Sequence, residues 1–294
     1  MDKLIITVAH TGNVPTKEMN PHTPVTIDEM VADIKKCAEL GAAVSHMHVR
    51  DEEGLPTSRR DLFEKLLNKL DEENVNIIRQ VSTGARGGEN TIEWRGQMLD
   101  LPQAQMASLA TGSSNFPSKV NANSPDLVIA LAEKMKANNV KPEIEVFDTA
   151  MISIARRLAD KGILQKPIHF NFVMNVPGSI EGTAKNLMFM VDSLPEGSTW
   201  TISAVGRSQM ELIPMAIAMG GHVRTGLEDV IEFPKGTKIS NAELVQRCVD
   251  IAKAVGREIA TPEEAMEMMS VTKKLGAETK DKEPKKSPSK KKKK

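Results

Sequence analysis

The sequence predicts an eight-stranded (β/α)8 barrel, the TIM barrel. Short apolar runs rich in β-branched residues alternate about eight times with longer segments of helical period. The pattern fills about 270 residues, which is the number of units and the length expected of this fold. A doubly wound sheet is the main alternative, but it usually has about five or six strands and a glycine-rich first turn. The first turn here is His10-Thr11-Gly12-Asn13, without a GxGxxG pattern.

The predicted strands and helices follow one another along the chain. Strands are expected at Leu4–Ala9, Ala43–Val49, Val75–Val81, Gln105–Ala110, Glu143–Phe147, Ile168–Met174, Thr199–Val205 and Gly221–Arg224. Helices are expected at Thr26–Leu40, Arg59–Leu70, Pro125–Asn138, Thr149–Lys161, Thr183–Ser193, Gln209–Met219 and Asn241–Val255. Residues that commonly cap helix N-termini support three of these starts, at Thr26, Ser124 and Ser240. Glycines, which readily adopt positive φ, lie just beyond four helix ends, at Gly41, Gly162, Gly220 and Gly256.

The charge of the chain is divided unevenly between a body and a tail. Residues 273–294 carry 11 lysines against three acidic residues, a charge of +8, and the remaining 28 basic and 36 acidic residues leave −8. We therefore predict a catalytic barrel over residues 1–272 and a disordered lysine-rich tail over 273–294. Such a tail can bind RNA or an anionic surface through counterion release. Because the body has no basic groove, we expect a solvated extension and no nucleic-acid partner.

The composition also predicts where the protein works. With 40% apolar and 27% charged residues, it is typical of a globular protein. No segment approaches the roughly 18 uncharged apolar residues that a membrane span needs. The N-terminal apolar run is too short for a secretory signal. Cys37 and Cys248 are far apart and without a metal-ligand spacing, so they are expected to be reduced core thiols of a cytoplasmic protein.

His46 and His48 are the first candidate metal ligands. Residues two apart in a strand point to the same face, so the two imidazoles lie side by side at a spacing that suits one metal ion. Two core or surface histidines that merely alternate are the alternative. The pair falls near the end of the second predicted strand, and catalytic groups of a TIM barrel gather at the C-terminal ends of its strands. We therefore predict a metal site.

The last predicted strand ends in Arg224 and is followed by Glu228 and Asp229. A carboxylate here could complete a His₂Glu set that leaves positions open for substrate, as a catalytic zinc site requires. Strands two and eight flank strand one in a barrel, so their ends converge. Of two adjacent carboxylates, one can bind metal and the other move protons, while Arg224 keeps Asp229 ionised or neutralises a developing oxyanion. An exposed acidic loop is the alternative.

Other polar residues follow the middle strands. The glycine-rich loop Ser82-Thr83-Gly84-Ala85-Arg86-Gly87-Gly88 suits a carboxylate or phosphate, although it could be only a turn. Ser108 lies near the end of the fourth strand, and Glu143 and Glu145 lie on the fifth. Because a buried carboxylate is costly without a partner, at least one of the two glutamates is expected to face the site or an arginine. The register of the strand decides which of the two glutamates faces the site.

Taken in order, these segments resemble the β-keto acid cleavage enzymes. The resemblance extends from the first strand to about Val271. It rests on Thr11-Gly12, Asn20-Pro21, Pro24-Val25-Thr26, His46-x-His48-x-Arg50-Asp51, Ser82-Thr83-Gly84, Met106-Ala107-Ser108-Leu109, Pro142-Glu143-Ile144-Glu145-Val146, Val176-Pro177-Gly178 and Gly220-Gly221-His222-Val223-Arg224-x-Gly226-x-Glu228-Asp229. Each motif is weak alone, but their order is specific.

The resemblance implies a TIM barrel with zinc on His46, His48 and Glu228. It implies that Asp229 is the general base, with Arg224 as its partner and electrostatic stabiliser. Ser82 and Ser108 would bind the substrate carboxylate. The implied reaction converts a 3-keto acid and acetyl-CoA into acetoacetate and a shortened acyl-CoA, through an enolate and a retro-Claisen cleavage. The family also suggests a homo-oligomer, plausibly a tetramer.

One position departs from the family pattern. The member that cleaves 3-keto-5-aminohexanoate has a glutamate for the substrate ammonium where this chain has Val14. Valine cannot pair with a cation, so the expected substrate lacks that amino group and has an apolar or neutral side chain. His10 and Asn13 are nearby in the sequence and are expected to supply polar contacts.

Three other functions compete with this one. An amidohydrolase-like zinc hydrolase also has an HxH pair, but on its first strand, with further histidines on the fifth and sixth strands. Here the pair is on the second strand, and only His169, on the sixth, matches. A CoA-independent keto-acid aldolase is the second alternative. A ligand-binding or scaffold barrel without catalysis is the third.

Overall fold

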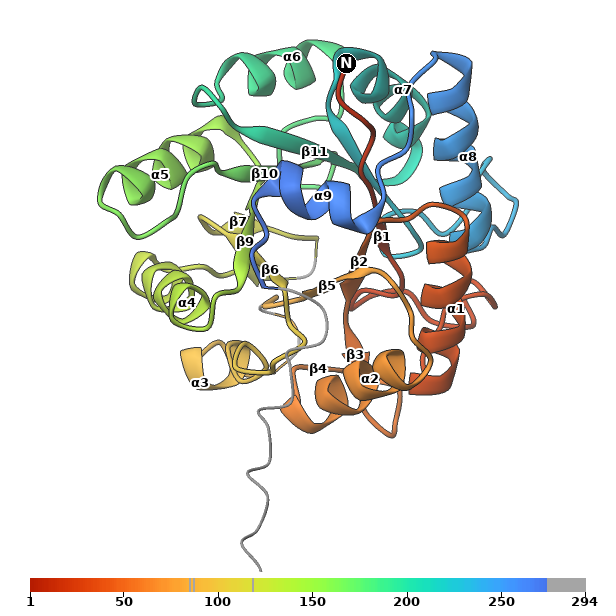
Figure 1. The fold of residues 1–294 in the computed structure, drawn as a ribbon, viewed down its shortest axis with the longest axis horizontal. Helices are drawn as coiled ribbons and strands as arrows, with labels where there is room; N and C mark the ends of the chain where they lie inside the picture. The colour runs from red at the N-terminus through yellow and green to blue at the C-terminus, as the bar shows by residue number, and fades with distance from the viewer. Residues whose placement is uncertain (85, 87, 118, 274–294) are drawn as a thin grey trace, which may run out of the picture.

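Eight parallel strands close into a barrel, which confirms the predicted TIM fold (Figure 1). The structure is a computed structural model that describes residues 1–273 except 85, 87 and 118. Around the barrel the order is β1-β12-β11-β10-β9-β6-β5-β2, so β2 and β12 flank β1 as predicted. The barrel strands are β1 Ile6–Ala9, β2 Val44–Met47, β5 Ile78–Val81, β6 Met106–Ala110, β9 Lys141–Val146, β10 His169–Met174, β11 Thr199–Ala204 and β12 His222–Thr225.

The predicted helices surround the barrel, and each agrees with its expected range to within two residues at either end. They are α1 Ile27–Glu39, α2 Arg60–Glu72, α4 Pro125–Ala137, α5 Thr149–Asp160, α6 Ala184–Asp192, α7 Gln209–Met219 and α8 Asn241–Ala254. Thr26 and Ser240 form capping boxes, and the Ser124 side chain accepts from the backbone N–H of Leu127. The four glycines beyond helix ends all have positive φ, at Gly41, Gly162, Gly220 and Gly256. Local sequence signals therefore set these boundaries.

The structure also contains short elements that were not predicted. They are α3 Ile92–Arg95, α9 Pro262–Met269, the turn η1 Gly206–Ser208, and the two-stranded sheets of β3 Val49–Arg50 with β4 Pro56–Thr57 and β7 Ser114–Asn115 with β8 Val120–Asn121. Helix α9 had a readable signal, because Thr261 and Glu264 form a capping box and Pro262 occupies the first turn.

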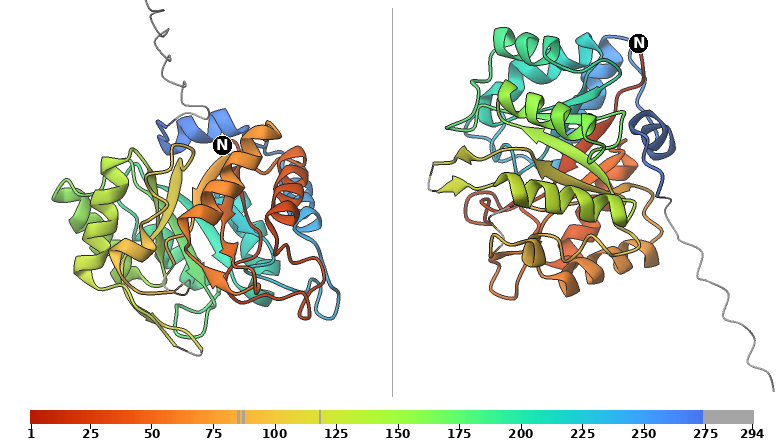
Figure 2. Two further views of the ribbon diagram at one scale, coloured as in Figure 1. Left: turned by 90° about the horizontal axis from the view of Figure 1, so that it is seen from below. Right: turned by 90° about the vertical axis from the view of Figure 1, so that its left-hand side faces the viewer.

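Helix α9 covers the N-terminal end of the barrel. Its Ala265 and Met269 pack against apolar residues at or before the first positions of four strands: Ile5, Ala43, Val44, Ile78 and Met106. Figure 1 shows α9 lying across the strands, and Figure 2 shows the β7–β8 hairpin projecting on the side away from it. Access to the barrel interior therefore lies at the C-terminal ends of the strands.

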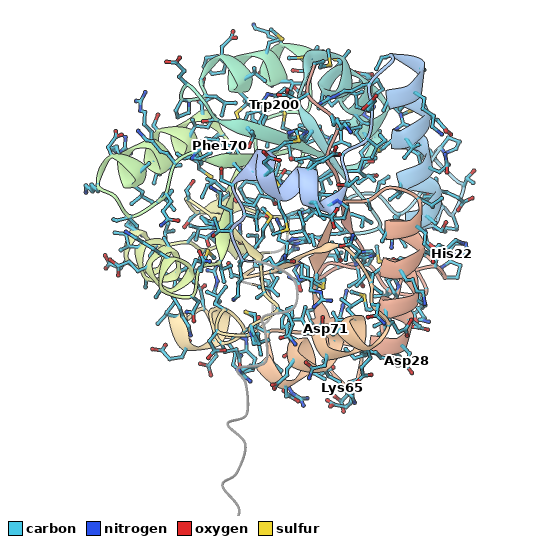
Figure 3. The ribbon with its side chains drawn as sticks, in the orientation of Figure 1. His22, Asp28, Lys65, Asp71, Phe170 and Trp200 are labelled. Carbon is cyan, nitrogen blue, oxygen red and sulfur yellow. The ribbon has the colours of Figure 1, made fainter. Side chains whose placement is uncertain are left out.

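The main core lies between the barrel strands and the helices. Phe170 and Trp200 are register partners on β10 and β11, and Phe172 stacks on Trp200 with ring centroids 5.5 Å apart. Figure 3 places Phe170 and Trp200 among these strands, whereas Asp28 and Lys65 lie at the outer edge. Both cysteines are buried and free, as predicted.

The C-terminal tail is described only at its first residue. Lys273 donates to the backbone carbonyls of Leu101 (3.0 Å) and Asn138 (3.3 Å). The rest of the predicted tail, 274–294, lies outside the described residues. Within the described part of the chain, no helix has the length and apolar character needed to cross a membrane.

Candidate active site

His46 and His48 lie at the C-terminal end of β2 with their side chains together. Their Nε2 atoms are 3.2 Å apart, and both imidazoles are buried. His46 is the register partner of Ala9 on β1 and of Gln80 on β5. As strand alternation predicted, the side chains of His46 and His48 therefore lie on the same face in the folded barrel.

Each histidine is oriented by an amide side chain on a neighbouring element. Nδ1 of His46 lies 2.6 Å from Oε1 of Gln80, and Nδ1 of His48 lies 3.1 Å from Oδ1 of Asn13. An amide oxygen only accepts hydrogen bonds, so both Nδ1 atoms carry the proton. The Nε2 lone pairs then face one another. This arrangement is unfavourable unless a cation lies between them.

Glu228 completes a three-ligand set. Its Oε2 is 3.7 Å from Nε2 of His46 and 3.5 Å from Nε2 of His48, and it has no hydrogen-bond partner among the described residues. Ligands about 2.0–2.1 Å from a tetrahedral zinc ion lie about 3.3 Å from one another. The three donor separations are close to that value, so the residues fit a zinc ion.

Arg224 connects Glu228 to its neighbouring carboxylates. Its Nε and Nη2 donate to the two carboxylate oxygens of Asp229, both at 2.9 Å. Its Nη2 also lies 2.8 Å from Oε1 of Glu228, and its Nη1 lies 3.5 Å from Oε1 of Glu145. The bidentate contact with Asp229 fixes the orientation of that carboxylate.

Burial and charge set the protonation states of this cluster. Burial lowers the pKa of His48 to about 3, and it also lowers the pKa of His46, so both imidazoles are neutral. Burial alone would raise the pKa of Glu228, but Arg224, His48 and His46 together outweigh it and hold that pKa below its usual range. Neutral histidines and an ionised glutamate are the forms that bind a metal. Burial raises the pKa of Asp229 despite Arg224, which makes this carboxylate a stronger base than an exposed one.

A cavity of about 250 Å³ opens above these residues. Its polar side includes His46, His48, Glu228 and Asp229. The opposing side is apolar and includes Phe116, Phe147, Val173 and Val176. Its volume is below the roughly 300–1,000 Å³ of pockets for drug-sized ligands, so it suits a small acyclic molecule.

The predicted substrate-binding loop divides into residues that line this cavity and residues that support it. Ser82 and Gly84 line it. The Thr83 backbone N–H donates to Oγ of Ser108 at 3.2 Å, and the Thr83 hydroxyl donates to the Ser108 carbonyl at 2.6 Å. Thr83 and Ser108 are therefore bonded to each other, and neither belongs to the cavity wall formed by the described residues.

Val14 and His10 lie in different surroundings. Val14 lines the cavity and is about half exposed. His10 is fully buried, with Nδ1 2.5 Å from Oδ2 of Asp33 and Nε2 3.0 Å from Oγ of Ser45. Both of its ring nitrogens are therefore engaged away from the cavity. The nearby grouping of His10, Asp33 and Cys37 consequently offers no free imidazole nitrogen for a metal.

The two glutamates of β9 both point into the barrel, but at different depths. Glu145 is nearer the C-terminal end and lines the cavity beside Arg224. Glu143 lies beneath it, fully buried, where it accepts from Nδ2 of Asn171 at 3.1 Å and lies 3.6 Å from Nε2 of His169. Strand alternation put them on one face. The position of β9 in the barrel decided which one reaches the mouth.

Sequence reasoning missed the role of Gln80. A signal was present, because Gln80 and Ser82 are two apart on one strand and so share a face. Phe116 was also missed as a wall residue. It follows β7, an element that was not predicted, and its ring contacts Phe147 edge-on with centroids 5.5 Å apart.

Comparison with known protein families shows to which family the chain belongs. A family model described as "beta-keto acid cleavage enzyme" matches residues 3–271 of this chain. The chain belongs to the β-keto acid cleavage enzyme family. The resemblance inferred from its motifs is thereby confirmed.

Relatives of this β-keto acid cleavage enzyme include proteins named for different keto acids. A 3-keto-5-aminohexanoate cleavage enzyme from Acetoanaerobium sticklandii is 44% identical over 93% of this chain and 100% of its own. A 3-oxoadipate:acetyl-CoA acetyltransferase from Cupriavidus necator is 40% identical, covering 91% and 94% of the two chains. The structure of ObcA with oxaloacetate has a TM-score of 0.73 at 19% identity, covering 85% of this chain and 68% of that one, and it supports the fold alone.

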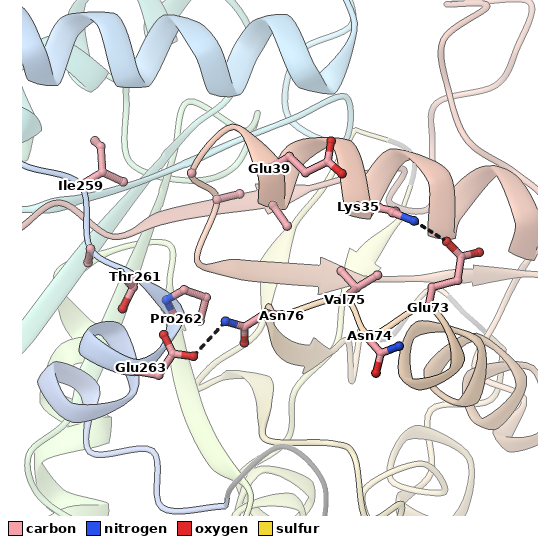
Figure 4. A pocket seen from close by; sticks show the side chains of 14 residues that line it. Lys35, Glu39, Glu73, Asn74, Val75, Asn76, Ile259, Thr261, Pro262 and Glu263 are labelled. Atoms are coloured by element: carbon pink, nitrogen blue, oxygen red, sulfur yellow. Dashed lines mark hydrogen bonds and ion pairs between the residues drawn. The ribbon is translucent and has the colours of Figure 1, made fainter.

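Another cavity of this β-keto acid cleavage enzyme, with a volume of about 540 Å³, lies at the other end of the barrel (Figure 4). Its polar side chains are largely paired: Nζ of Lys35 lies 3.1 Å from Oε2 of Glu73, and Nδ2 of Asn76 lies 2.8 Å from Oε1 of Glu263. The N-terminal end of a TIM barrel supports stability, whereas catalytic groups gather at the C-terminal end. The smaller cavity is therefore the candidate active site.

Proposed function

We propose that this enzyme is a zinc-dependent acyltransferase that converts a 3-keto acid and acetyl-CoA into acetoacetate and a shortened acyl-CoA. One observation carries the proposal. A fitted His₂Glu donor set and a buried carboxylate held by an arginine line the same small cavity. Family membership and the acetyl-CoA in the names of several relatives support the same chemistry.

His46, His48 and Glu228 would hold the zinc ion. Bound zinc polarises carbonyl oxygen, which increases the acidity of the carbon between the keto and carboxylate groups of a β-keto acid. Gln80 and Asn13 keep the two imidazoles in the required tautomer. Ser82, on the cavity wall, is placed to donate a hydrogen bond to the substrate carboxylate.

Asp229 acts as the general base. It removes a proton from the carbon between the two carbonyl groups, and the resulting enolate carbon attacks the acetyl thioester carbonyl. Arg224 holds Asp229 in position and stabilises negative charge near the oxygen atoms. The thioester C–S bond breaks, and the CoA thiolate that leaves attacks the original keto carbon. The bond between that carbon and the former enolate carbon then breaks, and Asp229 returns its proton to the released carbon. Acetoacetate and the shortened acyl-CoA are the products, so no water and no protein nucleophile is consumed.

A second cavity supports a route for acetyl-CoA. It has a volume of about 510 Å³ and shares Val14, Glu228 and Asp229 with the active-site cavity. The exposed Met210 and the cationic side chain of Arg207 also line it. Its apolar residues, such as Met210 and Phe233, suit the arm of CoA, and Arg207 and Lys235 provide cations for the CoA phosphates.

Val14 restricts which side chain the keto acid substrate can carry. An apolar residue at the cavity wall provides no partner for an ammonium group, so we infer that the physiological keto acid lacks one. Because relatives are named for an amino acid derivative and for 3-oxoadipate, the family name does not specify the substrate. A homo-oligomer, plausibly a tetramer, and a cytoplasmic location stay predictions.

A panel of 3-keto acids, assayed for acetoacetate with zinc present, tests the reaction. Acetoacetate should require both the keto acid and acetyl-CoA, and a thiol reagent should detect no net free CoA. A hydrolase would release thiol, and an aldolase would cleave the keto acid without acetyl-CoA. If no member of the panel produces acetoacetate, the proposal is wrong. Turnover of 3-keto-5-aminohexanoate above that of neutral acids would refute only the inference from Val14.

A further inference from the structure

Arg86 is a cation on the active-site cavity wall without an acidic partner. It follows the Ser82–Gly84 loop and lines the same cavity as His48 and Glu228. The described residues provide it with no hydrogen bond and no ion pair, in contrast to Arg224, which contacts three carboxylates. Its guanidinium instead lies over an aromatic ring, with Cζ 4.7 Å from the centroid of Phe116.

Burial makes this unpaired charge costly. Arg86 is partly buried, and loss of water lowers its pKa, while the negative charges of Glu228 and Glu145 act in the opposite direction. A cation–π contact of this kind contributes about 0.5–2 kcal/mol, which holds the guanidinium in place but does not neutralise it. A partly desolvated guanidinium with free donors on a cavity wall is a binding group for an anion.

Among the described residues, the guanidinium contacts the ring of Phe116 and makes no ion pair with the proposed metal ligands. His46 is on β2, His48 comes directly after it, and Glu228 follows β12, so the proposed metal set belongs to the ends of the two strands that flank β1. Phe116 follows β6 and β7, and β6 is diametrically opposite β12 in the ring of eight strands. Arg86 therefore extends from the loop after β5 towards Phe116, which follows the neighbouring strand β6 on the side of the barrel opposite β12. A ligand whose head contacts the metal set would reach Arg86 with its other end.

We propose that Arg86 binds a second carboxylate on the keto acid, so that the substrate is a 3-keto dicarboxylic acid. The proposal rests on the proposed function, and it narrows the substrate from any acid without an amino group to one with a distal anion. Arg224 cannot take this role without losing its contacts to Asp229, Glu228 and Glu145. Arg86 loses nothing when the anion binds.

Two keto acids of equal length test the proposal by catalysis. The dianion 3-oxoadipate and the monoanion 3-oxohexanoate are compared with acetyl-CoA in the wild type, in Arg86→Gln and in Arg86→Lys. Arg156→Gln, an exposed arginine on α5, is the matched control. The wild type should prefer the dianion. Arg86→Gln should lower kcat/KM for the dianion about ten- to a hundredfold, mainly through KM, because a hydrogen bond to a charged group is lost.

Turnover of the monoanion 3-oxohexanoate shows which carboxylate of the substrate Arg86 binds. If the guanidinium binds the distal carboxylate, Arg86→Gln leaves turnover of 3-oxohexanoate within about threefold of the wild type, and Arg86→Lys retains part of the preference because its charge is kept. An equal loss with both acids would mean that Arg86 binds the shared head carboxylate or supports the fold. That result, or a wild type without preference for the dianion, overturns the proposal.

Binding without turnover separates this proposal from the reaction itself. Adipate and hexanoate lack the keto group, and their binding to the zinc-loaded protein is measured by calorimetry. Adipate should bind more tightly than hexanoate to the wild type and to Arg156→Gln, but equally with hexanoate to Arg86→Gln. This outcome supports the Arg86 site even if no keto acid is converted. Equal binding of both acids to the wild type contradicts it even if the reaction is confirmed.

Discussion

The Nε2 atoms of His46 and His48 lie 3.2 Å apart and both face Oε2 of Glu228. The amide oxygens of Gln80 and Asn13 occupy the opposite sides of the two rings. Two lone pairs and an ionised carboxylate oxygen therefore converge on one point inside the protein. Such a convergence is stabilised by a cation, and the donor types favour zinc.

Removal of a donor should remove the metal. We expect about one zinc ion per chain in the purified protein and much less in His46→Ala and Glu228→Ala, measured by elemental analysis after dialysis. Gln80→Met, which removes only the hydrogen bond to Nδ1, should weaken zinc binding about ten- to a hundredfold. His22→Ala removes an exposed histidine and serves as the control. Absence of metal from the wild type and the variants alike would favour a scaffold barrel.

Loss of the base should separate catalysis from metal binding. Asp229→Asn keeps the size of the side chain and one acceptor towards Arg224, but it cannot accept the substrate proton. We expect kcat to fall by about 10²- to 10⁴-fold, while the zinc content stays unchanged. Steady-state kinetics and elemental analysis on the same preparation provide the comparison. Retention of full activity would exclude Asp229 as the base.

Gly12 positions Glu228 through a close approach. A Cβ at Gly12 would lie 2.5 Å from Cγ of Glu228, and the residue has a φ of +56°. Gly12→Ala should therefore displace Glu228 and weaken zinc binding. Gly236→Ala is the matched control, because Gly236 has a φ of +87° and a Cβ there would meet no atom within 4 Å. If both variants lose stability and only Gly12→Ala loses zinc, the contact with Glu228 is responsible.

Lys141 should make stability depend on pH at alkaline values. Burial lowers the pKa of this lysine from 10.5 to about 8, and its Nζ donates to the Pro167 carbonyl at 2.6 Å. Below pH 8 the charged form is present in both states, and its burial destabilises the fold. Between pH 8 and 10.5 the native state loses this proton before the unfolded state does, so the penalty falls as pH rises.

A variant isolates this effect. Across that pH range, the free energy of unfolding of the wild type should rise by about 1–3 kcal/mol relative to Lys141→Met, measured by denaturant titration. The difference between the two proteins should be constant below pH 7. A difference that stays constant up to pH 10.5 would show that Lys141 keeps an ordinary pKa in the folded protein.

Most of the fold could be predicted because its signals are local. Apolar alternation located the eight barrel strands, and caps such as Thr26 and Ser240 located helix starts to within one residue. The elements that were not predicted are short. Helix α9 has eight residues, and the β7–β8 pairs involve two residues on each strand. Such elements have too few residues for a periodic pattern, and α9 in addition packs on apolar residues that only the closed barrel brings together.

The candidate site was only partly predictable for a related reason. The sequence alone determined that His46 and His48 share a face, because strand alternation is a local property, and that Arg224 ends the last strand with Glu228 and Asp229 after it. Only the tertiary structure decided that Gln80 orients His46, that Thr83 and Ser108 bond to each other, and that Glu145 rather than Glu143 reaches the cavity. It also decided that Arg86 remains unpaired beside Phe116. These relationships depend on the register between strands and on closure of the barrel, which bring together residues that no local pattern connects.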